Sequence, residues 1–378
     1  MKINQKSFLL FLLFCLALYI PAFSQYSSLE NKDAVRLTRQ AIDSVYNLNF
    51  PAADKLIRQL EVGLGDYPGV LLLKAFYMSW KYRPIKKDQQ AFVDFEKLLN
   101  RSTSVCDSIL SVNQNDPEAT FFKLTSHAYL AQLYSDNGMN MKALGEAKEA
   151  YSYIKTGFDM VDQNPEFYFP CGIYNYYREK YPEENPFYKS FIWFFRSGDM
   201  AEGIEMLKKG SKAALFDNVE CYTYLFHIYL RYENKPVLAL PYARHLKEKY
   251  PRNLIYTSHY IENCIRMNQY AGLEPLIAKL LSSEVNFYRY LGEIYAGYYA
   301  EMVEKNYPKA IEHYKLADKL GNMDNVRIPN YDSILFLGMG RTYKKMGLGD
   351  LAHSSLKQSI KSAEYKAYRT PAEKLLRE

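Results

Sequence analysis

Apolar residues recur along the chain at intervals of three and four, which is the spacing of one face of an α-helix. Two early runs show it: Ala34, Leu37, Ala41 and Val45, then Leu56, Leu60 and Leu64. Strand-like alternation of apolar and polar residues is scarce. The pattern therefore predicts an all-α protein built from helices of ordinary length.

Short breakers, most of them containing proline, separate the predicted helices. They lie at 66–69, 115–118, 164–166 and 250–253. Pro68 precedes Pro117 by 49 residues and Pro117 precedes Pro165 by 48; a weaker break near Asp217 follows after 52 and Pro251 after a further 34. A period of this size indicates an array of helical hairpins that must stack on one another to bury their apolar faces.

The stretch 225–251 carries the most specific copy of the repeat. Tyr229 ends its first helix, Ala239 and Ala243 lie on the second, and Pro251 follows Ala239 by twelve residues. This pattern resembles the tetratricopeptide repeat (TPR) family, whose period is 34 residues. Further copies are marked by Leu291, Gly292 and Tyr295, by Gly340, Tyr343, Gly347, Ala352 and Leu356, and by Gly138, Ala143, Ala147 and Ala150.

The resemblance implies a right-handed α-solenoid of stacked antiparallel hairpins. Together with the signal peptide described below, it leads us to expect an exported bacterial TPR-like protein. We expect about eight hairpins over residues 25–378, with an aromatic insertion near 181–197. Trp is absent from the first position of the family pattern, and the long periods imply extended helices or inserted loops. The glycines of 172–175, 197–199 and 203–204 also resemble the eukaryotic tetratricopeptide 39 and inclusion-body-clearance proteins, which implies another helical scaffold.

The first 24 residues have the three parts of a secretory signal peptide. Lys2 and Lys6 precede 13 uncharged residues, 8–20, and Ala22 and Ser24 are small residues before the predicted cleavage site at Gln25. Cys15 also allows lipidation, although the bulky Phe14 precedes it. We expect an exported chain that is periplasmic, outer-membrane-associated or secreted, without a transmembrane segment after cleavage.

Composition narrows the class of function. The chain has 378 residues, 48% of them hydrophobic and 24% charged, and a formal net charge of +6, which excludes a disordered chain and argues against a nucleic-acid partner. Cys106, Cys171, Cys221 and Cys264 have neither zinc nor redox spacing, so we interpret them as buried thiols, while pairing stays open.

The sequence shows no motif of a known catalytic or cofactor site. The patterns HExxH, GxSxG, GxxxxGK and the EF-hand loop are missing, and the six histidines form no pair with metal-ligand spacing. We therefore predict a protein that is not an enzyme and uses no cofactor and no metal.

The inward-facing positions of the family pattern predict a binding groove on the concave wall of the solenoid. Arginine and tyrosine dominate these positions, which favours an acidic or C-terminal peptide as the ligand. Ordinary solvated side chains are the alternative interpretation. The predicted groove residues are Tyr224, Arg231, Tyr232, Glu262, Arg266, Arg289, Glu293, Arg341, Lys344 and Lys345.

The segment 181–195 crowds aromatic residues behind two prolines. We interpret it as an inserted loop and helix packed on a neighbouring hairpin; the alternative is an exposed docking patch for a partner or a membrane surface. The patch residues are Phe187, Tyr188, Phe191, Trp193 and Phe194.

Together these features predict a non-enzymatic scaffold or adaptor of the cell envelope that binds a protein or peptide in its concave groove. The alternative is a glycan- or nutrient-binding component of an outer-membrane uptake system. The sequence leaves the partner's identity and the oligomeric state open.

Overall fold

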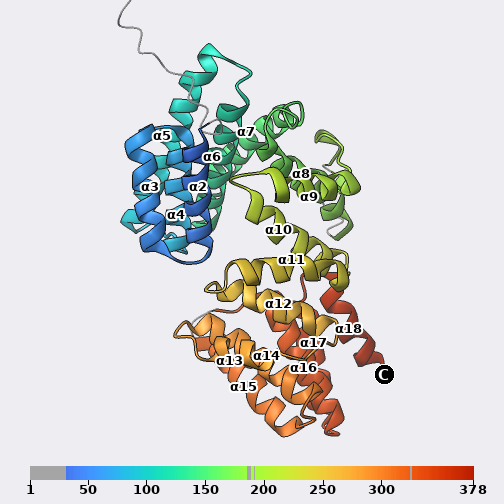
Figure 1. Ribbon diagram of the computed structural model, residues 1–378. Helices are drawn as coiled ribbons and strands as arrows, with labels where there is room; N and C mark the ends of the chain where they lie inside the picture. Colours follow the sequence, from blue (N-terminus) through green and yellow to red (C-terminus); the bar gives the residue numbers. More distant parts are fainter. Residues whose placement is uncertain (1–30, 185–188, 191, 324–325) are drawn as a thin grey trace, which may run out of the picture.

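The structure is a computed structural model that describes residues 31–378 except 185–188, 191 and 324–325. The predicted signal peptide, 1–24, lies outside the described residues. Throughout the described chain the secondary structure is helical, without a strand. The helices pack as consecutive antiparallel hairpins, so the predicted TPR-like α-solenoid is confirmed (Figure 1).

The long helices follow one another as hairpin partners, and a last helix stands alone at the C-terminus. The paired helices are α2 (Lys32–Tyr46) with α3 (Phe50–Leu64), α4 (Pro68–Lys81) with α5 (Gln90–Val112), α6 (Pro117–Asp136) with α7 (Asn140–Phe158), α8 (Tyr168–Glu184) with α9 (Met200–Ala213), α10 (Asn218–His227) with α11 (Pro236–Lys249), α12 (Leu254–Arg266) with α13 (Glu274–Leu281), α14 (Asn286–Met302) with α15 (Tyr307–Met323), and α16 (Pro329–Lys345) with α17 (Gly349–Ser362). The unpaired helix is α18 (Lys366–Arg377), and short irregular helices occur at η1 (Pro165–Phe167), η3 (Ile192–Phe194) and η4 (Ile228–Tyr232).

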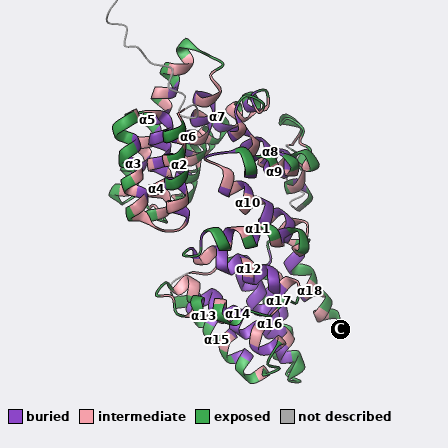
Figure 2. Ribbon diagram, viewed as in Figure 1, coloured by how far each residue is buried: buried purple, intermediate pink, exposed green. Residues whose placement is uncertain are grey.

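Most of the first helices of the hairpins also pack on the first helix of a neighbouring hairpin, and together they form an inner layer. Helix α4 contacts α2 and α6, α8 contacts α10, and α14 contacts α12 and α16. Helix α18 packs on α16 and η4. It takes the position that the first helix of a following hairpin would occupy. Burial is densest in the C-terminal half, where Tyr331 to Gly340 of α16 are all buried (Figure 2).

Two of the proline breakers are the first residues of long helices, whereas Pro251 lies in the turn between α11 and α12. Pro68 and Pro117 are the first residues of α4 and α6, where the missing N–H costs no helical hydrogen bond. Before Pro117, the Asp116 side chain accepts hydrogen bonds from the backbone N–H groups of Glu118 and Ala119, at 3.1 and 2.9 Å. These local signals fix where the hairpins that start with α4 and α6 begin.

The solenoid winds back on itself, so that α2 meets the end of α11 and the start of α12. The Tyr250 hydroxyl donates to Asp43 at 2.6 Å, and the Asn253 amide donates to the Tyr46 carbonyl at 2.8 Å. The Tyr46 hydroxyl donates to Glu220 of α10, also at 2.6 Å. We call this contact the junction, because it joins segments about two hundred residues apart in the sequence.

Among the described residues, no helix has the length and apolar character that a bilayer-spanning segment requires.

Cys106, Cys171, Cys221 and Cys264 are buried and free, which agrees with their interpretation as core thiols.

Helices α8 and α9 approach closely at the glycines that the sequence singles out. A Cβ on Gly203 would lie 2.7 Å from the Gly172 carbonyl oxygen and 2.8 Å from the Tyr176 nitrogen. A Cβ on Gly198 would lie 2.5 Å from the Asn175 carbonyl oxygen. The backbones of the hairpin therefore touch at positions where no side chain fits.

We expect Gly203→Ala to lower the free energy of unfolding by about 1–3 kcal/mol, because the new methyl group meets backbone that must move. Urea denaturation followed by circular dichroism measures the change. The matched control is Gly145→Ala in α7, where a Cβ meets nothing within 4 Å. That control should leave stability unchanged or raise it by up to about 1 kcal/mol; equal losses in both variants would contradict the close approach.

Candidate functional site

A row of aromatic rings lines the inner layer between α8 and η4. Phe169 and Tyr177 of α8 contact Tyr224 of α10, with ring centroids 5.2 and 6.2 Å apart, and Tyr177 contacts Tyr232 at 5.2 Å. All four side chains are partly exposed. We call these four residues the aromatic wall; their edge-to-face packing fixes the rings while leaving part of each accessible.

The wall ends in a π-helical turn. At η4 the backbone N–H of Glu233 bonds the Ile228 carbonyl at 2.9 Å, one residue further back than in an α-helix. π-Helical turns are rare and occur frequently at functional sites. This turn carries Arg231 and Tyr232, two of the predicted groove residues.

Arg231 and Glu262 form a buried ion pair behind the wall. The guanidinium lies 3.4 Å from the carboxylate, with 14% and 2% of the two side chains exposed. The Tyr368 hydroxyl of α18 also donates to Glu262. The pair therefore joins η4, α12 and α18, and an isolated charge at either position would be costly.

The C-terminal helix α18 is docked on this part of the inner layer. Arg266 donates to the Ala367 carbonyl at 3.0 Å and lies over the Tyr368 ring, 4.9 Å from its centroid. Tyr365, just before α18, packs on Tyr232 with centroids 4.7 Å apart. The chain's own C-terminus thus occupies the inner face directly beyond the aromatic wall.

A second buried ion pair lies further along. Arg341 donates two hydrogen bonds to Glu301, at 2.5 and 2.6 Å, and its guanidinium lies 4.8 Å from the centre of the Tyr298 ring. The Tyr314 hydroxyl adds a 3.0 Å bond to the same carboxylate. The Arg341 side chain therefore binds α14, and Tyr314 of α15 shares the same carboxylate.

The other predicted groove residues lie apart from the wall. Glu293 faces α15, where its carboxylate lies 2.7 Å from His313 Nδ1, and Arg289 is exposed next to Asn286. Lys344 donates to the Leu375 carbonyl of α18 at 3.2 Å, and Lys345 is exposed. The structure thus gathers Tyr224, Arg231, Tyr232, Glu262 and Arg266 into one region and places the remaining five elsewhere.

Four buried polar atoms without a hydrogen-bond partner belong to Arg231 and to three residues near it. They are His227 Nδ1, His259 Nδ1, Arg231 Nε and the Tyr295 hydroxyl. The two imidazoles touch, with centroids 5.0 Å apart. Burial, together with the nearby Arg231 charge, holds the pKa of both histidines well below the usual value, so both are neutral in the folded protein.

The buried carboxylate of Glu166 binds the backbone at the start of α10. Glu166 accepts backbone hydrogen bonds from Leu215, Phe216 and Asp217 at 2.5, 3.1 and 3.2 Å. Burial raises the pKa of Glu166 to about 7, although the backbone donors act against it, and burial also raises the pKa of Asp217. Glu166 thus holds the helix that carries Tyr224 in place.

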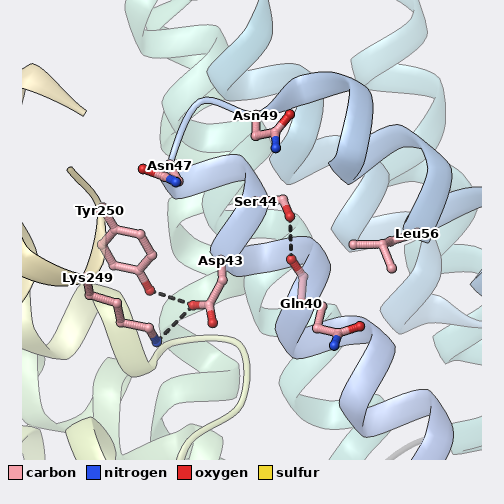
Figure 3. A pocket seen from close by; sticks show the side chains of 8 residues that line it. All are labelled: Gln40, Asp43, Ser44, Asn47, Asn49, Leu56, Lys249 and Tyr250. Atoms are coloured by element: carbon pink, nitrogen blue, oxygen red, sulfur yellow. Dashed lines mark hydrogen bonds and ion pairs between the residues drawn. The ribbon is translucent and has the colours of Figure 1, made fainter. Parts of the chain in front are cut away.

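The junction contains a polar hollow of about 400 Å³ (Figure 3). On one side Asp43 is held by Tyr250 and by Lys249, whose amine lies 2.8 Å away. The remaining wall comes from α2 and the start of α3, and the residues that line it are Gln40, Ser44, Asn47, Asn49 and Leu56. We call it the junction pocket; its lining is mostly amide and hydroxyl groups.

The predicted docking patch is described only in part. Phe187, Tyr188 and Phe191 lie outside the described residues. Trp193 and Phe194 are 69% and 66% exposed on η3. The described residues contain no group of three or more His, Cys, Asp or Glu side chains arranged to hold a metal ion.

Comparison with known proteins adds little beyond the fold. No protein-family model matches the chain, and no curated protein matches it. Yeast Tom70 is similar at 12% identity and a TM-score of 0.34, over 88% of this chain and 86% of that one. The human IFIT1 dimer with PPP-AAAA has 15% identity and a TM-score of 0.34, over 88% and 95% of the two chains. The monomeric IFIT1 mutant with Gppp-AAAA has 14% identity and a TM-score of 0.36, over the same shares. Likeness at this level says nothing about what this chain binds.

Sequence reasoning missed the wall residues of α8 and the docked C-terminus. Phe169 and Tyr177 are eight residues apart, a helical repeat that a search restricted to the family's inward positions passes over. Tyr365 lies just before α18, as its N-cap residue, and Tyr368 lies in its first turn. Their spacing of three was the available signal that this helix has an aromatic face.

The two neutral histidines predict a loss of stability in mild acid. In the unfolded chain they take up protons below about pH 6.5, whereas in the folded chain they do not. Acid therefore stabilises the unfolded state relative to the folded one. Below pH 6.5 we expect the free energy of unfolding of the wild type to fall faster than that of His227→Gln/His259→Gln. The additional loss should be on the order of 1 kcal/mol for each pH unit and for each of the two histidines. Urea unfolding between pH 7.5 and 5.5 measures this.

Acidic groups such as Glu166 contribute to both proteins and cancel in that comparison. The control is His353→Gln, because His353 is exposed on α17. Parallel pH profiles for the wild type and the double variant would contradict neutral burial of the pair.

Proposed function

We propose that the protein is a non-enzymatic scaffold whose inner face binds a segment of another protein, with the aromatic wall as the binding surface. The observation that carries the proposal is the docked C-terminus. A segment of this chain already uses the surface beside the wall, so the chemistry of that contact indicates what the inner face accepts.

Residues of the inner layer bind three groups of the C-terminal segment. The Tyr365 ring packs on Tyr232, the Tyr368 hydroxyl donates to Glu262, and the Ala367 carbonyl accepts from Arg266. Each is an aromatic or backbone group rather than an acid. A partner segment with aromatic side chains suits the same surface, because tyrosine rings give large contact area at low entropic cost.

The aromatic wall extends beyond its contact with Tyr365, the residue just before α18. Phe169, Tyr177 and Tyr224 remain partly exposed, so a partner segment lying there would meet rings that are already fixed in position. Rigid aromatic anchors are the usual centre of a protein interface.

The internal ion pairs alter the expected charge of the partner. Arg231 and Arg341 are each paired with a buried glutamate, and Arg266 bonds the backbone of α18. These arginines are therefore unsuited to an acidic or C-terminal peptide while α18 stays docked. We propose an aromatic-bearing segment of a cell-envelope protein, the compartment following from the predicted signal peptide.

The test is a cross-linked pull-down of residues 25–378 from envelope extract, quantified by mass spectrometry. We expect Tyr177→Ser/Tyr224→Ser to lose the recovered partner, with an affinity at least tenfold weaker once the partner is purified, since central aromatic anchors contribute more than about 1.4 kcal/mol. The loss should occur without unfolding, which circular dichroism checks.

The matched control is Tyr222→Ser/Tyr242→Ser. This pair is also half-buried and also in contact, at 6.0 Å between centroids, but it lies between α10 and α11 away from the wall. Equal recovery by both variants would refute binding at the wall.

The junction pocket favours glycan binding as a second candidate function. Its amide and hydroxyl groups match sugar hydroxyls, and Asn49 makes no capping hydrogen bond with α3. If a glycan binds there, a mixture of bacterial oligosaccharides should raise the melting temperature of the wild type but not of Asn49→Leu/Gln40→Leu. The wall variant Tyr177→Ser/Tyr224→Ser should keep the shift, and no shift for any protein rules this candidate out.

A further inference from the structure

Three consecutive aromatic side chains project into solvent between α8 and α9. Trp193 is 69% exposed, Phe194 66% and Phe195 45%. The rings of Trp193 and Phe194 stack on each other, with centroids 3.6 Å apart. Exposed aromatic side chains grouped in this way mark an interaction surface more often than isolated ones do.

The backbone under these rings is held firmly. Arg178 of α8 donates to the Ile192 carbonyl at 3.0 Å and to the Arg196 carbonyl at 3.1 Å. The Tyr174 hydroxyl donates to the same Arg196 carbonyl, and the Arg196 N–H donates to the Tyr151 hydroxyl at 3.0 Å. Polar contacts from α7 and α8 thus fix the segment, and the exposed rings stand on a rigid base.

The apolar surface continues along α7. Phe195 packs on Tyr151 with centroids 5.3 Å apart. Tyr151 shares one side of α7 with Leu144 and Met141, which are 64% and 80% exposed. At 100° per residue the three positions fall within about 80° of arc. We call Met141, Leu144, Tyr151, Trp193, Phe194 and Phe195 the aromatic platform.

Positive charges are interleaved with the platform. Lys148 and Lys155 lie on the same side of α7, and Arg196 follows the aromatic run. Lys155 lies 5.3 Å from the Tyr151 ring centre and Arg196 3.7 Å from that of Phe158. Within the described chain, no carboxylate lies at ion-pair distance from any of the three cations.

We propose that the aromatic platform docks the protein on the surface of an anionic lipid bilayer. Tryptophan and phenylalanine insert at the level of the headgroups, and lysine and arginine beside them meet lipid phosphates. The platform projects from a turn instead of lining a hollow, which suits a soft bilayer better than a partner's pocket. This role is independent of the aromatic wall.

The main experiment is co-sedimentation of residues 25–378 with vesicles of phosphatidylglycerol and phosphatidylethanolamine, and with phosphatidylcholine vesicles for comparison. We expect binding to the anionic vesicles that weakens as salt rises. Trp193→Ser/Phe194→Ser should bind at least tenfold more weakly, because burial of the two rings supplies much of the attraction. Lys148→Gln/Lys155→Gln should weaken binding and reduce its salt dependence.

The matched control is Val62→Ser/Val112→Ser, which removes two apolar side chains that are each 90% exposed on α3 and α5. It should bind like the wild type. Trp80→Phe leaves Trp193 as the sole tryptophan, since the chain has two. Its fluorescence should then shift to the blue when anionic vesicles are added.

Three results would overturn the proposal. They are no binding to anionic vesicles, binding that the ring variant retains, and equal binding to phosphatidylcholine at all salt concentrations. Loss of a protein partner by the ring variant, without any vesicle binding by the wild type, would assign the platform to a protein contact instead. The co-sedimentation experiment does not use the Trp80→Phe variant, so a folding defect in that variant would not affect its result.

Discussion

The structure depends on one constraint: no hairpin of this chain covers its own apolar surface. Helix α16 shows it most clearly, because ten consecutive residues, Tyr331 to Gly340, are buried around its whole circumference. A helix buried on all sides needs neighbours on all sides, and α16 has α14, α15, α17 and α18 around it. Helix α18 therefore supplies the last of these neighbours. The C-terminus is part of the core, and its docking on the inner face follows from the same requirement that stacks the hairpins.

The charges of the inner face follow from that burial. An arginine among packed tyrosines is stable only with an anion beside it. Arg231 has Glu262, and Arg341 has Glu301, each with a tyrosine hydroxyl on the same carboxylate. These pairs hold neighbouring hairpins and α18 together. The aromatic wall stays partly accessible on the inner face, and this is why recognition there is expected to depend on rings and backbone groups.

The chain presents aromatic side chains on two surfaces of different shape. The rings of the wall lie side by side between α8 and η4 and contact one another edge to face, so each is half-covered. The rings of Trp193 and Phe194 stand outward on a turn that Arg178 fixes from behind. A lined surface suits an extended segment that lies along it, whereas projecting rings among lysines suit a deformable charged surface.

The sequence by itself determined the local features: helices from the spacing of apolar residues, hairpin starts at Pro68 and Pro117, and close helix contacts at glycines such as Gly203. These depend on neighbours within one hairpin, so a repeat pattern contains them. It also placed Tyr224, Arg231 and Glu262 in one region, since the family's inward positions recur with the repeat. Only the tertiary structure decided which of those residues are accessible. The Arg341 pair joins residues 40 apart in the sequence and the Tyr368 bond to Glu262 joins residues 106 apart. Such contacts depend on the curvature of the whole solenoid and on the return of its last helix, which no local period encodes.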